Sequence, residues 1–163
     1  MKSHKVLFTI FLILTVAINV FIIVEGFIGG DGSASQSFSF TEMFIEIVKV
    51  IDPESEIVKN PEATHAVIRK LVGHFALFGI SGIFTVLTFV FTEEGLTTRK
   101  IETIYVSLSL GFLVALTSEL AQLVTPGRFM SFGDVGIDFA GFLTFGGLTY
   151  FISYLIKNRK KKE

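Results

Sequence analysis

Four long apolar runs, separated by polar segments, form the main pattern of the chain. They cover residues 6–24, 71–92, 104–124 and 135–156. Each run has about 20 residues, the length that an α-helix needs to cross a hydrocarbon core ~30 Å thick. None shows the alternation of apolar and polar residues that is typical of membrane β-strands. Because backbone groups in a bilayer must be paired within the protein, we predict an all-α integral membrane protein with four transmembrane helices.

The first run also has some features of a cleaved signal peptide. Lys2 and Lys5 precede it, and the small residues of the stretch 33–35 follow it. Its apolar core of 19 residues is longer than the ~7–15 residues of a typical signal sequence, and the small residues lie well beyond its end. We therefore expect residues 1–25 to be a retained N-terminal membrane helix that starts in the cytoplasm.

Residues 26–60 connect the first two spans and are expected to be extracellular. The Gly-rich stretch 29–33 is typical of a flexible turn. Ser39 followed by Glu42 has the spacing of a capping box, which predicts the start of a helix. On that helix, four apolar side chains share one face: Phe40, Phe44, Ile47 and Ile51. We expect this external amphipathic helix to lie flat on the outer leaflet or on the mouth of the bundle.

The second span is expected to begin before its apolar run. Asn60 is a typical N-cap, Pro61 suits the first helical turn, and Glu62 is an acid near a helix start. The helix should therefore start in water near Pro61 and continue unbroken through His74 into the membrane.

Composition agrees with one membrane domain and excludes several classes of protein and of site. Of the 163 residues, 18% are charged, against roughly 25% in soluble domains. The net charge of -1 provides no basic surface, so we expect no nucleic acid partner. Because the chain contains no cysteine, it has no disulfide framework, thiolate chemistry or Cys-based zinc site.

Basic residues favour one orientation of the spans. The N-terminus, the loop 93–103 and the tail 157–163 contain nine of the Lys and Arg residues, and the opposite side contains five. Since cytoplasmic segments carry the excess of Lys and Arg, we predict a multi-pass cell-membrane protein with both termini in the cytoplasm. The three tyrosines support this orientation because they lie at the same span ends: Tyr105, Tyr150 and Tyr154.

Polar side chains within the spans gather at one depth. At a rise of 1.5 Å per residue, His74 and Asp138 lie ~5 Å below the outer ends of their spans, and Glu119 and Asn19 lie ~8 Å below theirs. The inner half of the spans contains no acidic, basic or histidine residue. Since such residues are costly in lipid and usually mark a site, we predict a shared polar layer near the outer surface.

Helical spacing groups these residues further. Three pairs are three or four residues apart: Glu119 and Gln122, Asp134 and Asp138, and Lys70 and His74. Residues at such spacing share a helix face. The small residues Ser107, Gly111 and Ala115 continue the face of Glu119, and we expect them to permit close helix packing.

Pro126 and Gly127 end the third span, and only about ten residues precede the fourth. Spans three and four should therefore form an antiparallel hairpin with Arg128 at its external tip. Glu119 and Asp138 are then expected to come close across the hairpin.

The polar layer and the hairpin tip define a candidate ligand-binding site. Its predicted residues are Lys70, His74, Glu119, Gln122, Arg128, Asp134 and Asp138. Arg128 and Lys70 would hold an anionic group through charge-assisted hydrogen bonds, and the amphipathic helix would be a lid. His74, Glu119 and Asp138 are candidate catalytic residues, because an imidazole beside carboxyl groups suits general acid–base chemistry. The chain has no Ser or Cys nucleophile motif and no phosphate loop, so enzymatic activity stays open.

Three other interpretations stay open. The polar residues can be interhelical hydrogen bonds without further function. An oxygen-rich set of His74, Glu119, Asp134 and Asp138 suits a hard cation, but a single His without the usual ligand spacing does not favour it, so we expect no metal and no cofactor. A channel or transporter is disfavoured because transport sites normally lie near the bilayer midplane.

Four segments, in order, carry a resemblance to a known family. They are Arg69-Lys70-x-x-x-His74, Glu119-x-x-Gln122, Pro126-Gly127-Arg128 and Asp134-x-x-x-Asp138-x-x-Gly141. This order resembles the VanZ-like family of small bacterial membrane proteins, whose namesake is associated with resistance to the glycopeptide teicoplanin. The resemblance extends from Arg69 to the end and leaves the external segment outside. It implies a VanZ-like three-helix region at 61–163 with a basic cytoplasmic tail, and it matches His74, Glu119, Gln122, Arg128 and Asp134 to the recurring polar positions of the family.

Four residues depart from the family pattern. Phe78 stands where Tyr is common, Ser118 where an acid is frequent, Phe145 where Gly is usual, and Asp138 where Asn is frequent. The resemblance implies cell-surface protection or resistance to glycopeptide or lipoglycopeptide antibiotics. The expected partners are membrane lipids and a lipid-linked cell-wall component or a lipoglycopeptide. The alternative is an intramembrane acid–base enzyme that acts on a lipid-linked cell-envelope substrate.

Overall fold

The computed structural model describes residues 2–92 and 100–159, and this part of the chain is helical without any strand. Four helices are long and apolar enough to cross a membrane: His4–Gly26, Pro61–Val90, Ile101–Leu123 and Phe132–Arg159. The prediction of an all-α, four-span protein is therefore confirmed.

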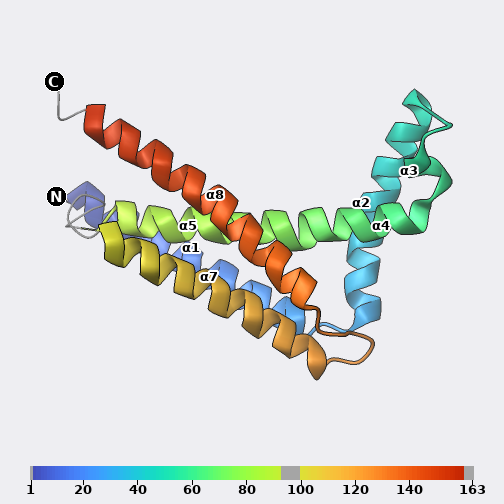
Figure 1. Ribbon diagram of the computed structural model, residues 1–163, viewed down its shortest axis with the longest axis horizontal. Coiled ribbons are helices and arrows are strands. Elements are labelled where there is room, and N and C mark those ends of the chain that lie inside the picture. The colour runs from blue at the N-terminus through green and yellow to red at the C-terminus, as the bar shows by residue number, and fades with distance from the viewer. Residues whose placement is uncertain (1, 93–99, 160–163) are drawn as a thin grey trace.

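The helices follow one another with short connections (Figure 1). In chain order they are α1 (Lys2–Gly26), α2 (Gly30–Ile51), α3 (Glu56–Lys59), α4 (Pro61–Ile68), the π-helix η1 (Arg69–Ala76), α5 (Leu77–Val90), α7 (Lys100–Leu123) and α8 (Phe132–Arg159). Both α1 and α8 have their terminal ends at the same end of the bundle, as an even number of crossings requires. Which side of the membrane this end faces stays a prediction.

The bundle consists of α1, α5 and α7 side by side, with α8 packed mainly across α5 (Figure 1). Glycines make this crossing close. A Cβ on Gly82 would lie 2.5 Å from the carbonyl oxygen of Phe142, and one on Gly141 would collide with the carbonyl oxygen of Phe75. On the other side of α8, the ring of Phe142 fills the space over Gly111. The expectation that Gly111 permits close packing is therefore confirmed.

Residues 61–90 form one continuous helix from α4 through η1 to α5. The Asn60 side chain accepts a hydrogen bond from the Ala63 amide (3.3 Å), and Pro61 occupies the first turn, so the predicted helix start is confirmed. The sequence did not predict that Arg69–Ala76 is a π-helix. Such wide turns are rare and occur frequently at functional sites.

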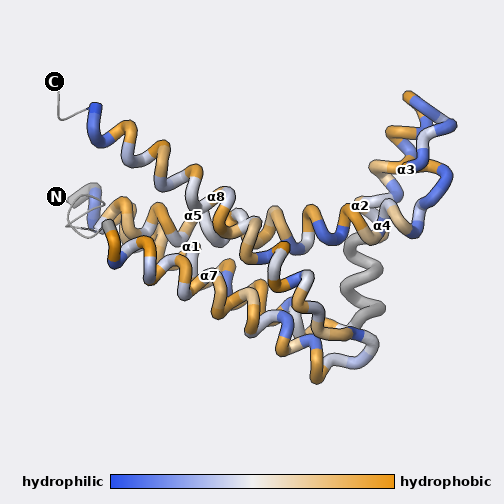
Figure 2. The backbone as a smooth tube through the Cα atoms, in the orientation of Figure 1, coloured by the Kyte–Doolittle hydropathy of each residue, from blue (hydrophilic) through white to orange (hydrophobic). Residues whose placement is uncertain are grey.

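Helix α2 begins earlier than predicted. It starts at Gly30, so Ser39 lies inside the helix and the predicted capping box is wrong. The predicted turn at 29–33 is also wrong beyond Gly29, because α2 already begins at Gly30. Figure 1 shows α2 running across the end of the bundle, and its predicted apolar face is exposed: Phe40, Phe44, Ile47 and Ile51. Apolar residues predominate along the bundle, and hydrophilic ones gather at the tip around α3 (Figure 2).

Candidate functional site

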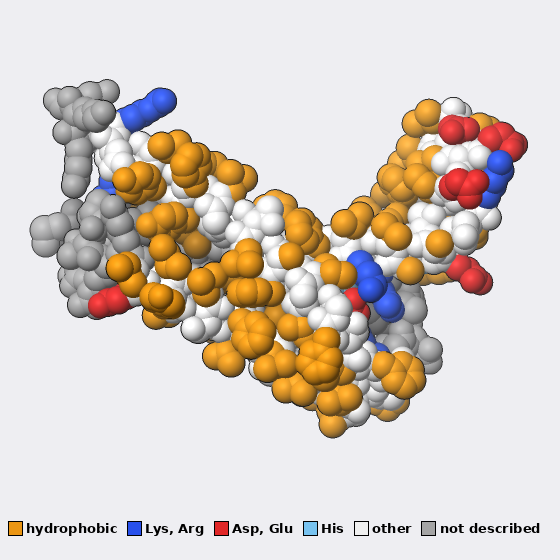
Figure 3. Space-filling view, viewed as in Figure 1, with side chains coloured by type: hydrophobic (Ala, Val, Ile, Leu, Met, Phe, Trp, Pro, Cys, Tyr) orange, Lys and Arg blue, Asp and Glu red, His pale blue; other side chains and the backbone are white. Residues whose placement is uncertain are grey.

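Two parallel contacts join η1 to the first turns of α8. The Lys70 Nζ atom lies 2.9 Å from Asp134 Oδ1, and His74 Nδ1 lies 2.9 Å from Asp138 Oδ1. Lys70 and His74 are four residues apart on one helix, and Asp134 and Asp138 are four apart on the other. The predicted spacing therefore does bring the four side chains together. Asp138 is fully buried, whereas Lys70 is partly exposed. In Figure 3, basic and acidic side chains meet at the end of the bundle near α2 and α4.

The hairpin between α7 and α8 was predicted correctly, with Gly127 in a left-handed conformation (φ 72°). At its end, the Asp134 amide donates to Ser131 Oγ (3.2 Å), so Ser131 caps α8. In a capping box, the side chain of the third helical residue accepts a hydrogen bond from the backbone amide of the N-cap residue. Here the Ser131 amide donates instead to Glu119 Oε2 (2.9 Å), and the Asp134 carboxylate pairs with Lys70.

Glu119 is the acceptor at the end of a directed chain of hydrogen bonds. Arg128 Nε donates to Gln122 Oε1 (3.2 Å), and Gln122 Nε2 donates to Glu119 Oε1 (2.5 Å). Arg128 Nη1 also donates to the carbonyl oxygens of Glu25 (3.1 Å) and Ile28 (3.3 Å) at the end of α1. A guanidinium and a backbone amide can only donate, so residue 119 must accept on both oxygens. A carboxylate meets this requirement and an amide does not.

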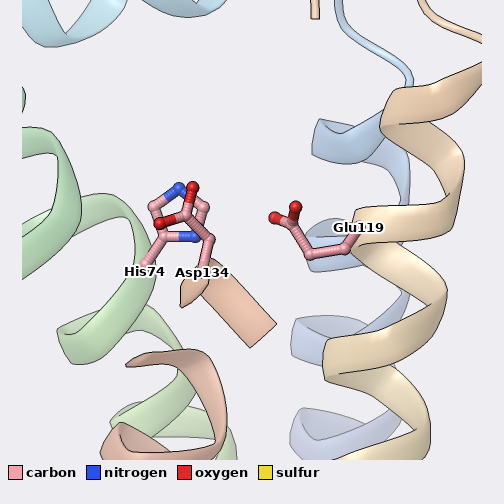
Figure 4. Close-up of side chains that lie close together, drawn as sticks. All are labelled: His74, Glu119 and Asp134. Carbon is pink, nitrogen blue, oxygen red and sulfur yellow. The ribbon is translucent and has the colours of Figure 1, made fainter. Parts of the chain in front are cut away.

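The fully buried Glu119 belongs to a compact group with His74 and Asp134. One potential ligand atom from each residue lies within 4.8 Å of the others. Figure 4 shows the Glu119 carboxylate pointing from α7 toward His74 and Asp134. Among the described residues, none forms an ion pair with Glu119, although burying a charge without a counterion is costly. The structure therefore groups Glu119 with His74 and Asp134, whereas the sequence predicted a close approach of Glu119 to Asp138.

A cavity of about 300 Å³ lies beside this group. Four predicted site residues line it: His74, Gln122, Arg128 and Asp138. Lys70, Glu119 and Asp134 are not part of its lining. Arg69 lines the cavity. The sequence instead predicted its neighbour Lys70, which is four positions before His74. Burial and the nearby charge of Arg69 lower the pKa of Arg128.

The cavity walls are largely apolar. They are formed by Phe21, Ile22, Phe40, Ile68, Val72, Leu77 and Phe78. Among the described side chains of α2, which are those of residues 38–51, Phe40 lines this cavity. Of the departures from the family pattern, Phe78 is a wall residue, and the Phe145 ring packs over Gly79, where a Cβ would lie 2.5 Å from it.

Other polar residues of the spans are interhelical contacts rather than site residues. The Ser81 hydroxyl donates to Asn19 Oδ1 (2.7 Å), and the hydroxyls of Thr15 and Thr88 lie 3.0 Å apart. Asn19 lies in the polar layer predicted from the sequence but is not part of the cavity lining. For these residues, the interpretation as interhelical hydrogen bonds is sufficient.

Comparison with protein-family models gives a match. A family model described as VanZ/LLP1 matches residues 8–155. The match covers most of the chain and includes residues 26–60, which the resemblance had left outside. No curated protein and no solved structure matches the chain significantly.

Proposed function

The chain belongs to the VanZ/LLP1 family, and on this premise we propose that it binds the anionic headgroup of an amphiphile in an outward-facing pocket. The amphiphile is a membrane lipid, a lipid-linked cell-wall component or a lipoglycopeptide. Binding would protect the cell surface and raise resistance to glycopeptide or lipoglycopeptide antibiotics.

The lining of the cavity is the observation that carries this proposal. Arg69 and Arg128 supply two guanidinium groups, and apolar side chains form most of the remaining wall. A guanidinium binds phosphate or carboxylate through two parallel hydrogen bonds. An acyl or polyprenyl chain suits the apolar part. The same cavity therefore fits both ends of an anionic amphiphile.

The two arginines have different roles in this proposal. Arg128 is fixed by its hydrogen bonds to Gln122 and to the end of α1. These described bonds use Nε and Nη1, so Nη2 is the part of the guanidinium left for a ligand. Arg69 is exposed at the mouth of the cavity, where substitution removes charge with little effect on packing.

The test compares Arg69→Gln with a cation outside the cavity, Lys49, which is exposed and pairs with Glu46. Wild-type protein in a susceptible bacterium should raise the inhibitory concentrations of teicoplanin and of a lipoglycopeptide. Arg69→Gln should abolish this rise, and Lys49→Gln should retain it at equal expression. No rise with wild type, or an equal rise with Arg69→Gln, contradicts the proposal.

A binding assay examines the same site without cells. Purified protein should bind anionic lipid vesicles in preference to zwitterionic ones, and Arg69→Gln should weaken binding about 10- to 100-fold, the value of one charge-assisted hydrogen bond. Glu25 also lines the cavity and repels an anion, so Glu25→Gln should strengthen binding. Weaker binding by Glu25→Gln contradicts the assignment of an anionic ligand.

One observation favours the second candidate, an intramembrane acid–base enzyme. His74 lines the cavity while its Nδ1 contacts the buried Asp138 carboxylate. In catalytic dyads the same arrangement orients the imidazole so that its other nitrogen exchanges protons with substrate. Purified protein should then convert a labelled lipid-linked cell-envelope precursor, and His74→Gln should not. Absence of product with wild type across such precursors contradicts this candidate.

A further inference from the structure

We propose that His74, Glu119 and Asp134 bind one divalent transition-metal cation, with Zn²⁺ as the best-suited ion. Glu119 and Asp134 do not line the cavity of the anionic ligand site, and His74 is the one proposed metal ligand that does. The test of the anionic ligand site changes Arg69, which is not a proposed metal ligand, so the failure of one proposal can be distinguished from the failure of the other.

Geometry provides the first argument. The three side chains come from η1, α7 and the first turn of α8, and their potential ligand atoms lie within 4.8 Å of one another. Zinc lies about 2.0–2.2 Å from nitrogen and oxygen ligands, so ligand atoms in an occupied site are roughly 3.5 Å apart. Small side-chain movements would bring these three atoms to that separation (Figure 4).

The surroundings of each ligand provide the second argument. His74 Nδ1 contacts Asp138, which leaves Nε2 for a cation. Glu119 is held by Gln122 and by the Ser131 amide. Lys70 contacts Asp134 Oδ1, which leaves Oδ2. Metal ligands in proteins are typically oriented by such partners, and a carboxylate behind a histidine is the most frequent form.

Charge provides the third argument. The cluster contains the carboxyl groups of Glu119, Asp134 and Asp138. The ammonium group of Lys70 pairs with Asp134. Arg128 reaches Glu119 only through Gln122. Asp138 Oδ2 is buried and has no hydrogen-bond partner among the described residues. With neutral His74, three carboxylates and one ammonium leave two negative charges, which a divalent cation would balance.

The donor set selects the kind of cation. One imidazole nitrogen and two carboxylate oxygens suit Zn²⁺ better than Mg²⁺ or Ca²⁺, which prefer oxygen ligands alone. Three protein ligands also leave one position of a tetrahedral zinc site for water or a ligand. A cation on Nε2 would prevent His74 from acting as a general base at the same time.

The experiment uses the full chain in detergent micelles after chelator treatment. Zn²⁺ is titrated in competition with a chromophoric chelator, and elemental analysis gives the stoichiometry. Wild type should bind about one equivalent. Asp134→Asn and His74→Gln should weaken binding at least about tenfold, and Asp138→Asn, which removes the positioning carboxylate, about 10- to 100-fold. His65→Gln and Glu62→Gln on α4 are matched controls that should bind as wild type.

A further variant separates metal binding from folding. Lys70→Gln breaks the same ion pair as Asp134→Asn but removes no ligand. It should bind Zn²⁺ at least as tightly as wild type, because a positive charge near the cation is lost. Absence of Zn²⁺ binding by wild type, equal binding by Asp134→Asn, or equal losses in Lys70→Gln and Asp134→Asn would each overturn the proposal. Binding of Mg²⁺ or Ca²⁺ in preference to Zn²⁺ would also overturn it.

Discussion

The two halves of the bundle are held together by different means. At the hairpin end, buried and partly buried polar residues join three helices. We refer to this region as the polar end: Lys70, His74, Glu119, Gln122, Arg128, Ser131, Asp134 and Asp138. In the half nearer the chain termini, helices meet through glycine, aromatic and hydroxyl contacts, such as Gly82 on Phe142 and Thr15 on Thr88. We refer to that region as the apolar half.

This difference separates packing from site construction. Close approach of Gly82 and Gly146 brings the backbones of α5 and α8 together with no buried charge to desolvate. Glu119, by contrast, is fully buried and needs two donors of fixed direction. A membrane bundle has no packing requirement for such a residue, since polar groups in lipid are costly. Packing alone therefore does not explain the buried polar side chains of the polar end.

The largest stability effect should come from the apolar half. In Gly82→Ala, the new Cβ would lie 2.5 Å from the Phe142 carbonyl oxygen, a backbone atom that cannot move alone. We expect a loss of about 3 kcal/mol in the free energy of unfolding, measured in detergent by denaturant titration. Gly147→Ala is the matched control, because nothing lies within 4 Å of its Cβ position. Equal stability of the two variants would contradict the close crossing of α5 and α8.

The next effect tests the directed hydrogen bonds of the polar end. Glu119→Gln places an NH₂ group opposite either the Ser131 amide or Gln122 Nε2, and Arg128 prevents Gln122 from flipping. A buried donor without an acceptor should cost about 2 kcal/mol in the same unfolding measurement. Ser118→Ala is the control, since that hydroxyl bonds the Ala115 carbonyl of its own helix. A Glu119→Gln variant as stable as wild type would show that residue 119 does not need to accept twice.

Features that depend on hydropathy and helical spacing were predictable from the sequence. Continuous apolar runs identified the four spans, and Pro126 with Gly127 identified the hairpin. The grouping of His74 with Asp138 was also predictable, because polar side chains at one depth in lipid find each other.

Features that depend on tertiary contacts were not predictable. The π-helix at 69–76 has no composition signal and lies where the Gly141 backbone approaches Phe75. The sequence selected Lys70 and Arg128 as the cations that hold an anionic ligand. Arg128 lines the cavity, but Lys70 pairs with Asp134, and its neighbour Arg69 lines the cavity instead. The hydrogen bond from the Ser131 amide to Glu119 joins residues that are twelve apart across a turn. Helical periodicity does not predict such a contact.

The smallest effect should come from the hydroxyl pair of the apolar half. Thr88 Oγ1 donates to the Phe84 carbonyl (2.9 Å), so Thr15 is the donor in the contact between them (3.0 Å). Thr15→Val removes that donor and leaves no hydroxyl group without an acceptor. We expect a loss of about 0.6 kcal/mol in the free energy of unfolding. Thr9→Val is the control, because its hydroxyl bonds only its own helix, at the Lys5 carbonyl. The double variant Thr15→Val/Thr88→Val isolates the pairwise energy. A coupling energy as large as the loss in Glu119→Gln would show that the two halves do not differ in kind, because hydroxyl pairs alone would then hold the helices as firmly as the charged groups.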